Sequence, residues 1–147
     1  MKPYDPNYAT RVRASFEKQR LMTTLGAVLD VVEPGRVDIR LPFREDLTQQ
    51  HGFLHAGAIA SVADSACGYA ALSLMPADAG VLSIEFKCNL LAPAMGDGIV
   101  ARGSVIRAGK TVMVCRADVF SIMNGEEKLV AAMQGTMMVA RDRGLTD

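Results

Sequence analysis

The chain has 147 residues, of which half are apolar, and its 16 Lys and Arg residues balance 16 Asp and Glu residues. This length suits a single domain, 1–147, that buries roughly two thirds of the surface exposed by the unfolded chain. The balanced charge argues against nucleic acid as a partner, because nonspecific binding depends on a broad positive field.

The first segment, 1–23, is expected to form a helical flank. Tyr8 to Met22 carries several charged residues and offers Val12 and Phe16 for packing, which is typical of a surface helix. The same charges are incompatible with a secretory signal. Two strands are expected next, Leu25 to Val32 and Arg36 to Phe43, and the second alternates apolar with charged residues.

A long buried helix is predicted from His55 to about Met75. Apolar residues surround its axis, which indicates a central position, and Pro76 ends it. The apolar stretch could be mistaken for a membrane span, but Asp64 at its middle would cost about 3 kcal/mol there. We therefore expect no association with a membrane.

From Gly80 the apolar pattern changes from helical to alternating. Leu82, Ile84, Phe86, Cys88 and Leu90 are expected on one face of a half-buried strand, with the polar residues between them on the other. Three more strands follow, and the last turn, Asn124-Gly125, is a strong hairpin signal. The order of the elements is two strands, one helix and four strands. This order predicts an α+β fold in which an antiparallel sheet of five to six strands wraps around one helix.

The three cysteines, Cys67, Cys88 and Cys115, are widely spaced in apolar runs and form no CxxC pair. We interpret them as reduced core residues, which favours a cytoplasmic protein. The two histidines, His51 and His55, are not at metal-ligand spacing, and the sequence has no phosphate-binding glycine loop and no GxSxG motif.

The segment from His51 to Ala58, with Asp64 in the helix that follows, carries the candidate chemistry. Glycines at a helix start let a ligand approach unpaired N–H groups at the positive end of the helix dipole, which suits an oxyanion. Asp64 is a carboxylate among apolar residues and needs either a partner or a function. Taken alone, Asp64 and His55 could also be a hydrogen-bonded structural Asp and a helix cap.

Helix geometry places Asp64 far from the N–H groups at the helix start. Nine residues at 1.5 Å each put Asp64 roughly 13 Å from the helix start, so one carbonyl cannot contact both. If both act on one substrate, the N–H donors of one chain must meet the carboxylate of another across a two-fold axis. The chemistry would then require a homodimer at least.

The segments HGFLHAGAIASVADSA and SIEFKCNLLAPA resemble the hotdog acyl-CoA thioesterases of the phenylacetate-pathway (PaaI-like) type, and RAGK resembles the glycine-and-basic turn of that family. The resemblance runs from about Leu25 to Arg141. It implies a hotdog fold, a homotetramer built from dimers, and hydrolysis of acyl-CoA without a metal or cofactor, coenzyme A being part of the substrate.

Carried over by position, the resemblance makes Asp64 the general base or nucleophile and Gly57 the backbone donor to the thioester carbonyl. His55 would help to orient that carbonyl, and Ser83 would hold the attacking water, although strict alternation puts Ser83 on the polar face. Two positions depart from the pattern: Ala56 replaces a glycine, and Gln49, for which Gln50 is a possible substitute, stands where Asn is common.

Further residues are expected to contact substrate. Ala56 and Gln50 are expected near the acyl-CoA, and the CoA phosphates are expected at cations and a hydroxyl near turns and strand ends: Arg107, Lys110, Thr111 and Arg141. Six apolar residues could line an acyl pocket for medium or longer chains, or could equally be ordinary core: Met22, Phe53, Leu54, Tyr69, Leu72 and Met75.

Two other functions remain open from the sequence. A hotdog hydratase or dehydratase would use a His and a carboxylate to move water across a carbon–carbon double bond. A noncatalytic acyl-CoA-binding protein could use the same fold, because fold does not fix function.

Overall fold

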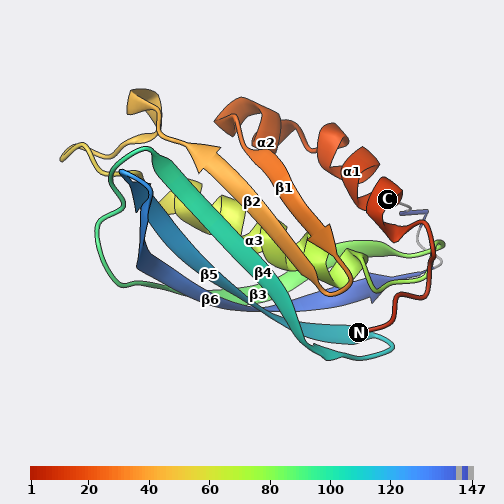
Figure 1. Ribbon diagram of the computed structural model, residues 1–147. Coiled ribbons are helices and arrows are strands. Elements are labelled where there is room, and N and C mark those ends of the chain that lie inside the picture. Colours follow the sequence, from red (N-terminus) through yellow and green to blue (C-terminus); the bar gives the residue numbers. More distant parts are fainter. Residues whose placement is uncertain (142–143, 146–147) are drawn as a thin grey trace.

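The computed structural model describes residues 1–141, 144 and 145. Its centre is a six-stranded antiparallel sheet with the order β1-β2-β4-β5-β6-β3, and the sheet curves around the long helix α3 (Figure 1). The strands are β1 Val28–Glu33, β2 Arg36–Pro42, β3 Gly80–Leu90, β4 Gly98–Ala108, β5 Val112–Met123 and β6 Glu126–Ala140. The predicted α+β architecture, with six strands around one helix and a helical N-terminal flank, is confirmed.

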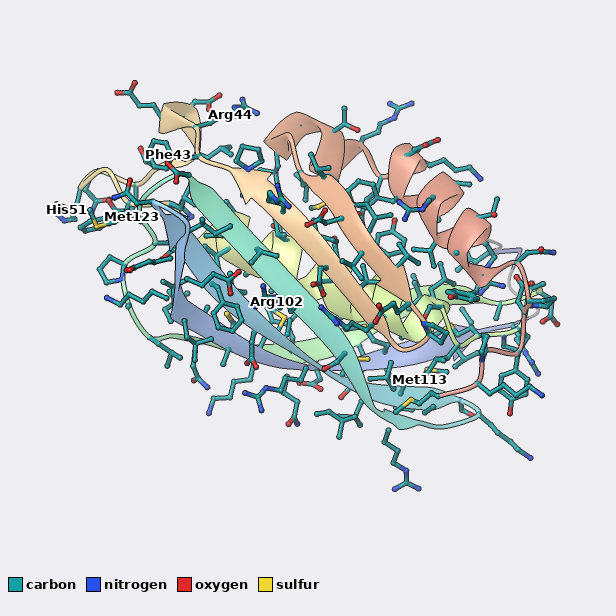
Figure 2. The ribbon with its side chains drawn as sticks, viewed as in Figure 1. Phe43, Arg44, His51, Arg102, Met113 and Met123 are labelled. Atoms are coloured by element: carbon teal, nitrogen blue, oxygen red, sulfur yellow. The ribbon has the colours of Figure 1, made fainter. Side chains whose placement is uncertain are left out.

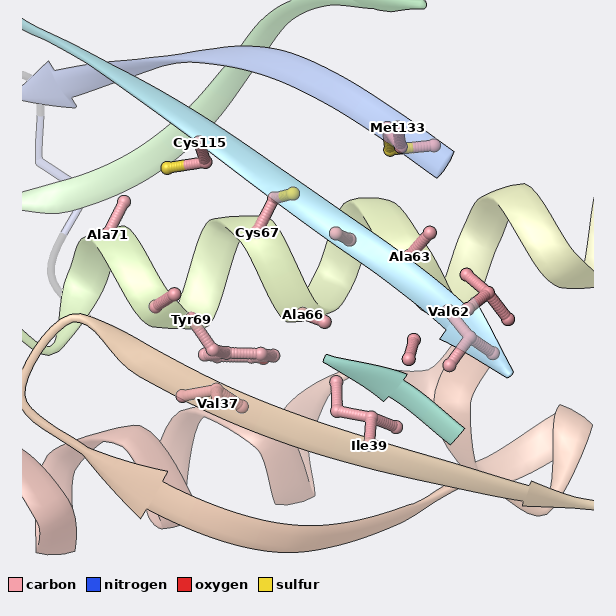
Figure 3. Packing of buried hydrophobic residues seen from close by; sticks show 14 of the residues in the cluster. Val37, Ile39, Val62, Ala63, Ala66, Cys67, Tyr69, Ala71, Cys115 and Met133 are labelled. Atoms are coloured by element: carbon pink, nitrogen blue, oxygen red, sulfur yellow. The ribbon is translucent and has the colours of Figure 1, made fainter. Parts of the chain in front are cut away.

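Helix α3, Ala56–Leu72, is enclosed by the sheet on most of its surface. Figure 3 shows Cys67 on the side of α3 that faces β5, the strand that carries Cys115, whereas Tyr69 is directed toward Val37 of β2. The helix backbone comes close to Gly103 of β4, where a Cβ would lie 2.3 Å from the backbone of Ala66. The helix can therefore lie this deep in the sheet only because position 103 has no side chain.

The N-terminal flank is two helices and not the single helix expected from Tyr8 to Met22. Helix α1, Tyr8–Lys18, ends at Gln19, whose ψ of 92° is extended, and α2, Arg20–Leu25, follows. The expected first strand also begins later than predicted, at Val28, because Leu25 still belongs to α2 and Gly26 caps that helix with a φ of 76°.

Strand β3 differs from the alternation that its sequence predicts. Ser83 pairs with the buried Met137, Glu85 pairs with Thr136, and Ile84 between them has no partner, which is a β-bulge. Residues directly opposite each other in antiparallel strands share a face. Ser83 therefore lies on the inner face and Leu82 on the outer one, the reverse of the expected placement, while the expected faces hold from Phe86 onward.

The expected half-burial of β3 is also wrong for this single chain, because β3 lies at the edge of the sheet. Its large apolar side chains stay 41–54% exposed: Leu82, Ile84, Phe86 and Leu90. The outer face of the sheet, which points away from α3, is polar. Figure 2 shows Arg102 on the middle of β4, where it pairs with Glu127. Within the described part of the chain, no helix is both long and apolar enough to cross a membrane.

Candidate active site

The start of α3 is capped by His55, whose ring folds back over the first turn. Its Nδ1 accepts a hydrogen bond of 2.8 Å from the Gly57 amide. A Cβ on Gly57 would lie 3.0 Å from that Nδ1, so the glycine makes room for the ring. Because Nδ1 is an acceptor, the neutral ring carries its proton on Nε2, and the His55 side chain is exposed.

This cap changes which amide at the helix start is open to a ligand. The Gly57 N–H, expected as the carbonyl donor, already has a partner in the His55 ring. The Ala58 and Ile59 amides both donate to the His55 carbonyl. Among residues 1–141, 144 and 145, no acceptor is recorded for the Ala56 amide, which leaves it as the open donor of the first turn.

A groove of about 390 Å³ lies beside this amide. Gln49, Phe53 and Ala56 line it together with the end of β3 and the residues after it, including Leu90 and Leu91. The Gln49 side-chain oxygen accepts from the His51 amide, which fixes the carboxamide at the groove. Gln50 is exposed and does not line this groove, so Gln49 is the better placed of the two glutamines.

Asp64 lies eight residues further along α3, beside a second and smaller pocket of about 130 Å³. Its Oδ1 accepts a hydrogen bond of 2.7 Å from the Ser83 hydroxyl. No other hydrogen bond to this carboxylate is found within the described residues, so Oδ2 remains available to a ligand. The inward position of Ser83 follows from the bulge at Ile84, and the sequence contains no glycine or proline there that marks it.

The electrostatics of Asp64 suit a proton acceptor. Burial raises the pKa of this carboxyl above its ordinary value, because the charged form is desolvated, and the hydrogen bond from Ser83 opposes part of that rise. A carboxylate with a raised pKa is a stronger base than an exposed one and still ionises once the pH exceeds that pKa.

The walls of the Asp64 pocket include residues that the sequence did not indicate as functional. Ser15 and Gln19 come from the N-terminal flank, and Ser65, Gly68 and Tyr69 come from α3. Val81 and Ser83 of β3 complete the lining. Nothing in the sequence links the flank to Asp64, because these positions are more than forty residues apart along the chain.

The two halves of the candidate site are separate within one chain. The groove at the Ala56 amide and the pocket at Asp64 lie at different places along α3, and strand β3 extends from one to the other, with Ser83 in the pocket and Leu90 in the groove. Neither half alone provides both a base and a free amide donor.

The residues expected to bind the CoA phosphates do not form one cluster. Lys110 and Arg141 line a pocket of about 240 Å³ near Pro76, at the end of α3 remote from Ala56, together with Tyr4. Arg107 and Thr111 are exposed but do not line this pocket. The Nε of Arg141 lies 3.7 Å from an Asp78 oxygen.

The candidate acyl-pocket residues are mostly core. Met22, Leu54, Leu72 and Met75 are at most 4% exposed and belong to the hydrophobic core. Tyr69 is also a core residue and lines the Asp64 pocket, and Phe53 and Leu54 line the groove. The apolar bulk that suggested a medium or longer acyl chain is therefore used for folding.

The cysteines show no disulfide. Cys67 and Cys115 are buried, as predicted, and Cys88 is half-buried. Burial raises the pKa of all three thiols, that of Cys115 to about 12, so they stay protonated and weakly nucleophilic. His51 is exposed at the end of the molecule that carries Phe43 and Met123 (Figure 2). The described residues contain no group of three or more His, Cys, Asp or Glu that could hold a metal.

Comparison with known proteins adds family evidence. The thioesterase superfamily model matches residues 51–128, a span that includes α3 and β3 with Ala56, Asp64 and Ser83. A Halobacterium salinarum protein that carries a provisional esterase name is 31% identical, over 91% of this chain and 93% of its own length. The 1,4-dihydroxy-2-naphthoyl-CoA hydrolase of Listeria monocytogenes is 28% identical, over 84% and 98%. Human acyl-coenzyme A thioesterase 13 is 28% identical, over 82% and 85%.

Solved structures agree with this result. A thioesterase family protein from Silicibacter pomeroyi is 48% identical and superposes with a TM-score of 0.90, over 91% of this chain and 98% of that one. The PaaI protein of the E. coli phenylacetic acid degradation operon superposes with a TM-score of 0.82 at 19% identity, over 93% and 96%. At that identity the second match supports the hotdog fold alone.

Proposed function

This chain belongs to the thioesterase superfamily, and on that premise we propose that it hydrolyses acyl-CoA thioesters to a free acid and coenzyme A. The observation that carries the proposal is Asp64, a carboxylate whose only recorded hydrogen bond within the described residues comes from Ser83, beside an open pocket. The acyl-CoA hydrolases among the relatives support the choice of thioester. We also propose the phenylacetate-pathway type, because the HGFLHAGAIASVADSA segment resembles the signature of that type.

In the proposed reaction, Asp64 acts as a general base. Ser83 holds Oδ1, and Oδ2 takes a proton from the water that attacks the thioester carbonyl. The negative charge that develops on the carbonyl oxygen is stabilised by the Ala56 N–H and the positive end of the α3 dipole. When the tetrahedral intermediate breaks its carbon–sulfur bond, the proton held by Asp64 passes to the leaving thiolate.

The partner for each half of the site is a second copy of the chain. Strand β3 is an open edge with large exposed apolar side chains, which a partner strand would cover. Antiparallel pairing of β3 with the partner's β3, about an axis near Phe86 and Lys87, would place Leu90 of one chain beside Ser83 of the other. The Ala56 amide would then face the partner's Asp64.

A pair of such dimers would give the tetramer that the resemblance implies, and light scattering would measure it. In the dimer, Gln49 would stand beside the thioester, and the exposed His55 Nε2–H is a second donor within the same helix start. Lys110 and Arg141 would offer their charges to a phosphate of coenzyme A.

A free-thiol assay over CoA esters of graded length tests the activity. The wild-type protein is expected to release CoA, and Asp64→Asn should reduce kcat by a factor of at least about a hundred, which is typical for loss of a general base. Turnover retained by Asp64→Asn at unchanged oligomeric state would refute the role of Asp64. An enoyl product without thiol would indicate a hydratase, and binding without turnover a noncatalytic protein.

Ala56→Pro is the matched variant for the other half of the site. Proline removes the N–H and fits the first position of a helix, and His55 before it already has the extended ψ of 139° that proline requires. The helix should therefore form normally. Loss of turnover with unchanged thermal stability would support the Ala56 amide as the carbonyl donor.

A further inference from the structure

The Asp64 pocket has a polar wall that general-base chemistry does not require. Ser15, Gln19 and Ser65 line it opposite Val81 of β3, and the Ser65 hydroxyl donates to the Gln19 side-chain oxygen at 3.1 Å. Ser15 and Ser65 are each only 7% exposed. Polar groups are placed this deep only when they are hydrogen-bonded or contact a ligand.

Gln19 still has hydrogen-bonding capacity at this wall. Its carboxamide oxygen is occupied by Ser65, which directs the amide so that its NH₂ group is the free end. Within residues 1–141, 144 and 145 no acceptor is recorded for that NH₂ group. Gln19 is half-buried and lines the pocket, so a ligand there would meet an unpaired donor.

The wall is held in place at several points. The Gln19 amide donates to the Phe16 carbonyl at 3.0 Å, and the Gln19 carbonyl accepts from the Met22 amide at 3.1 Å. The Phe16 ring packs edge-on against Tyr69 with centroids 5.7 Å apart. At the other end of α1, the Arg11 guanidinium donates to the Leu72 carbonyl at 2.8 Å, which ties α1 to the end of α3. These contacts fix the positions of Gln19 and Tyr69 in the pocket wall.

The volume of the pocket limits the size of the group that can bind. The pocket measures about 130 Å³. A protein cavity of about 150 Å³ holds one benzene ring, so the Asp64 pocket accommodates a group of about that size. A long alkyl chain would exceed it and would also leave the Gln19 NH₂ group without an acceptor, which disfavours binding.

We infer that Gln19 is a specificity-determining residue that selects short acyl groups bearing a hydrogen-bond acceptor, such as a carbonyl or hydroxyl oxygen, at their far end. This inference rests on the proposed thioesterase activity, because it takes the Asp64 pocket as the acyl site. The acceptor binds the Gln19 NH₂ group, Ser65 holds the carboxamide in that orientation, and Tyr69 forms the apolar side of the pocket.

The test uses CoA thioesters that differ only in the acceptor. The pairs are 3-oxobutanoyl with 3-methylbutanoyl, 4-oxopentanoyl with 4-methylpentanoyl, and 5-oxohexanoyl with 5-methylhexanoyl, because a methyl group replaces the oxo oxygen at nearly constant volume. A straight-chain series from acetyl to decanoyl measures length. We expect kcat/KM to peak at six carbons or fewer and to favour the oxo member of at least one pair by roughly three- to tenfold.

Two variants assign that preference to Gln19. Gln19→Leu removes both polar groups, whereas Gln19→Glu keeps an acceptor for Ser65 and replaces the NH₂ donor with a second carboxylate oxygen and its charge. Both should abolish or invert the oxo preference. Glu17→Gln, at an exposed position of α1, is the control and should keep the wild-type ratio.

The outcomes separate the two proposals. Thiol release from any ester upholds the thioesterase function. The specificity inference is overturned if decanoyl-CoA is the best substrate, if no pair favours its oxo member, or if Gln19→Leu and Gln19→Glu leave the ratio unchanged. Absence of thiol release from every ester would refute the thioesterase function itself, and the inference with it.

Discussion

Two opposing influences determine the pKa of Asp64, and both depend on its neighbours. Burial on α3 raises its pKa, and the Ser83 hydroxyl lowers it by donating to Oδ1. A carboxyl with no hydrogen bond would be protonated over more of the pH range and would accept a proton less often. In the proposed reaction, Ser83 would therefore act through the ionisation of Asp64 as well as through any water that it holds.

Ser83→Ala is expected to shift the acid limb of the pH–kcat/KM profile to higher pH. Removing the hydrogen bond takes away the influence that lowers the pKa of Asp64, so the pKa rises further above its ordinary value. The base is active as a carboxylate, and activity is lost as pH falls through that pKa, so the loss begins at higher pH in the variant. We expect roughly a tenfold lower kcat/KM near neutral pH, because hydrogen bonds to charged groups contribute about 1.5–3 kcal/mol.

Ser83→Thr is the matched control, since it keeps the hydroxyl on a residue that suits a strand. Its acid limb should coincide with that of the wild-type protein. An acid limb that stays in place in Ser83→Ala would mean that the serine does not contact the carboxylate during turnover.

At the scale of elements, two glycines determine how α3 fits its surroundings. Gly103 of β4 lies against the backbone of Ala66, and a Cβ there would lie 2.3 Å from it. Gly68, inside α3, has the opposite environment, because a Cβ there would meet nothing within 4 Å, and it lines the Asp64 pocket. The first glycine permits close packing, and the second keeps space open at a cost in helix stability.

Alanine substitutions at these two glycines should therefore have opposite effects on the stability of the fold. Gly103→Ala is expected to destabilise the fold by about 1–3 kcal/mol, because α3 or β4 must move. Gly68→Ala should stabilise it by up to about 1 kcal/mol through helix propensity, while shifting the preferred acyl length to shorter chains. Chemical denaturation and the graded thioester series measure the two effects. A stabilised Gly68→Ala variant with an unchanged length profile would show that Gly68 does not bound the acyl site.

The sequence predicts those helices, strands and turns that depend on the local pattern of residues. The buried helix, the alternation of β2 and the Asn124-Gly125 turn form where expected, and that turn has φ values of 52° and 80°. The expected end of the helix is wrong, because α3 ends at Leu72, before Met75 and Pro76. The sequence does not predict features that depend on contacts between residues far apart in the chain. The helix break at Gln19 and the bulge at Ile84 depend on packing against α3 and on pairing with β6. Those two features bring Gln19 and Ser83 to Asp64, so the sequence indicates Asp64 as a candidate base but does not indicate most of its surroundings.

At the scale of the whole molecule, the proposed base and the proposed amide donor lie at different positions on one helix. Asp64 is eight residues from Ala56, about 12 Å along the axis, and bending α3 enough to join them would break the packing at Gly103. A two-fold dimer joins them without any change in the chain. In the proposed dimer, the open edge of β3, which would be an aggregation hazard in a monomer, would become the interface that completes the site.

Mixing two inactive variants tests this arrangement. Homodimers of Asp64→Asn lack the base, and homodimers of Ala56→Pro lack the donor. A hybrid dimer has one site that combines Asp64 of the second variant with Ala56 of the first, and one site that lacks both. Random exchange of equal amounts makes about half of the dimers hybrids, so about one quarter of wild-type turnover should return. Subunits are exchanged by mild denaturation and refolding, and thiol release is measured before and after. If base and donor act within one chain, every site in the mixture lacks one of them, and turnover stays at the level of the separate variants.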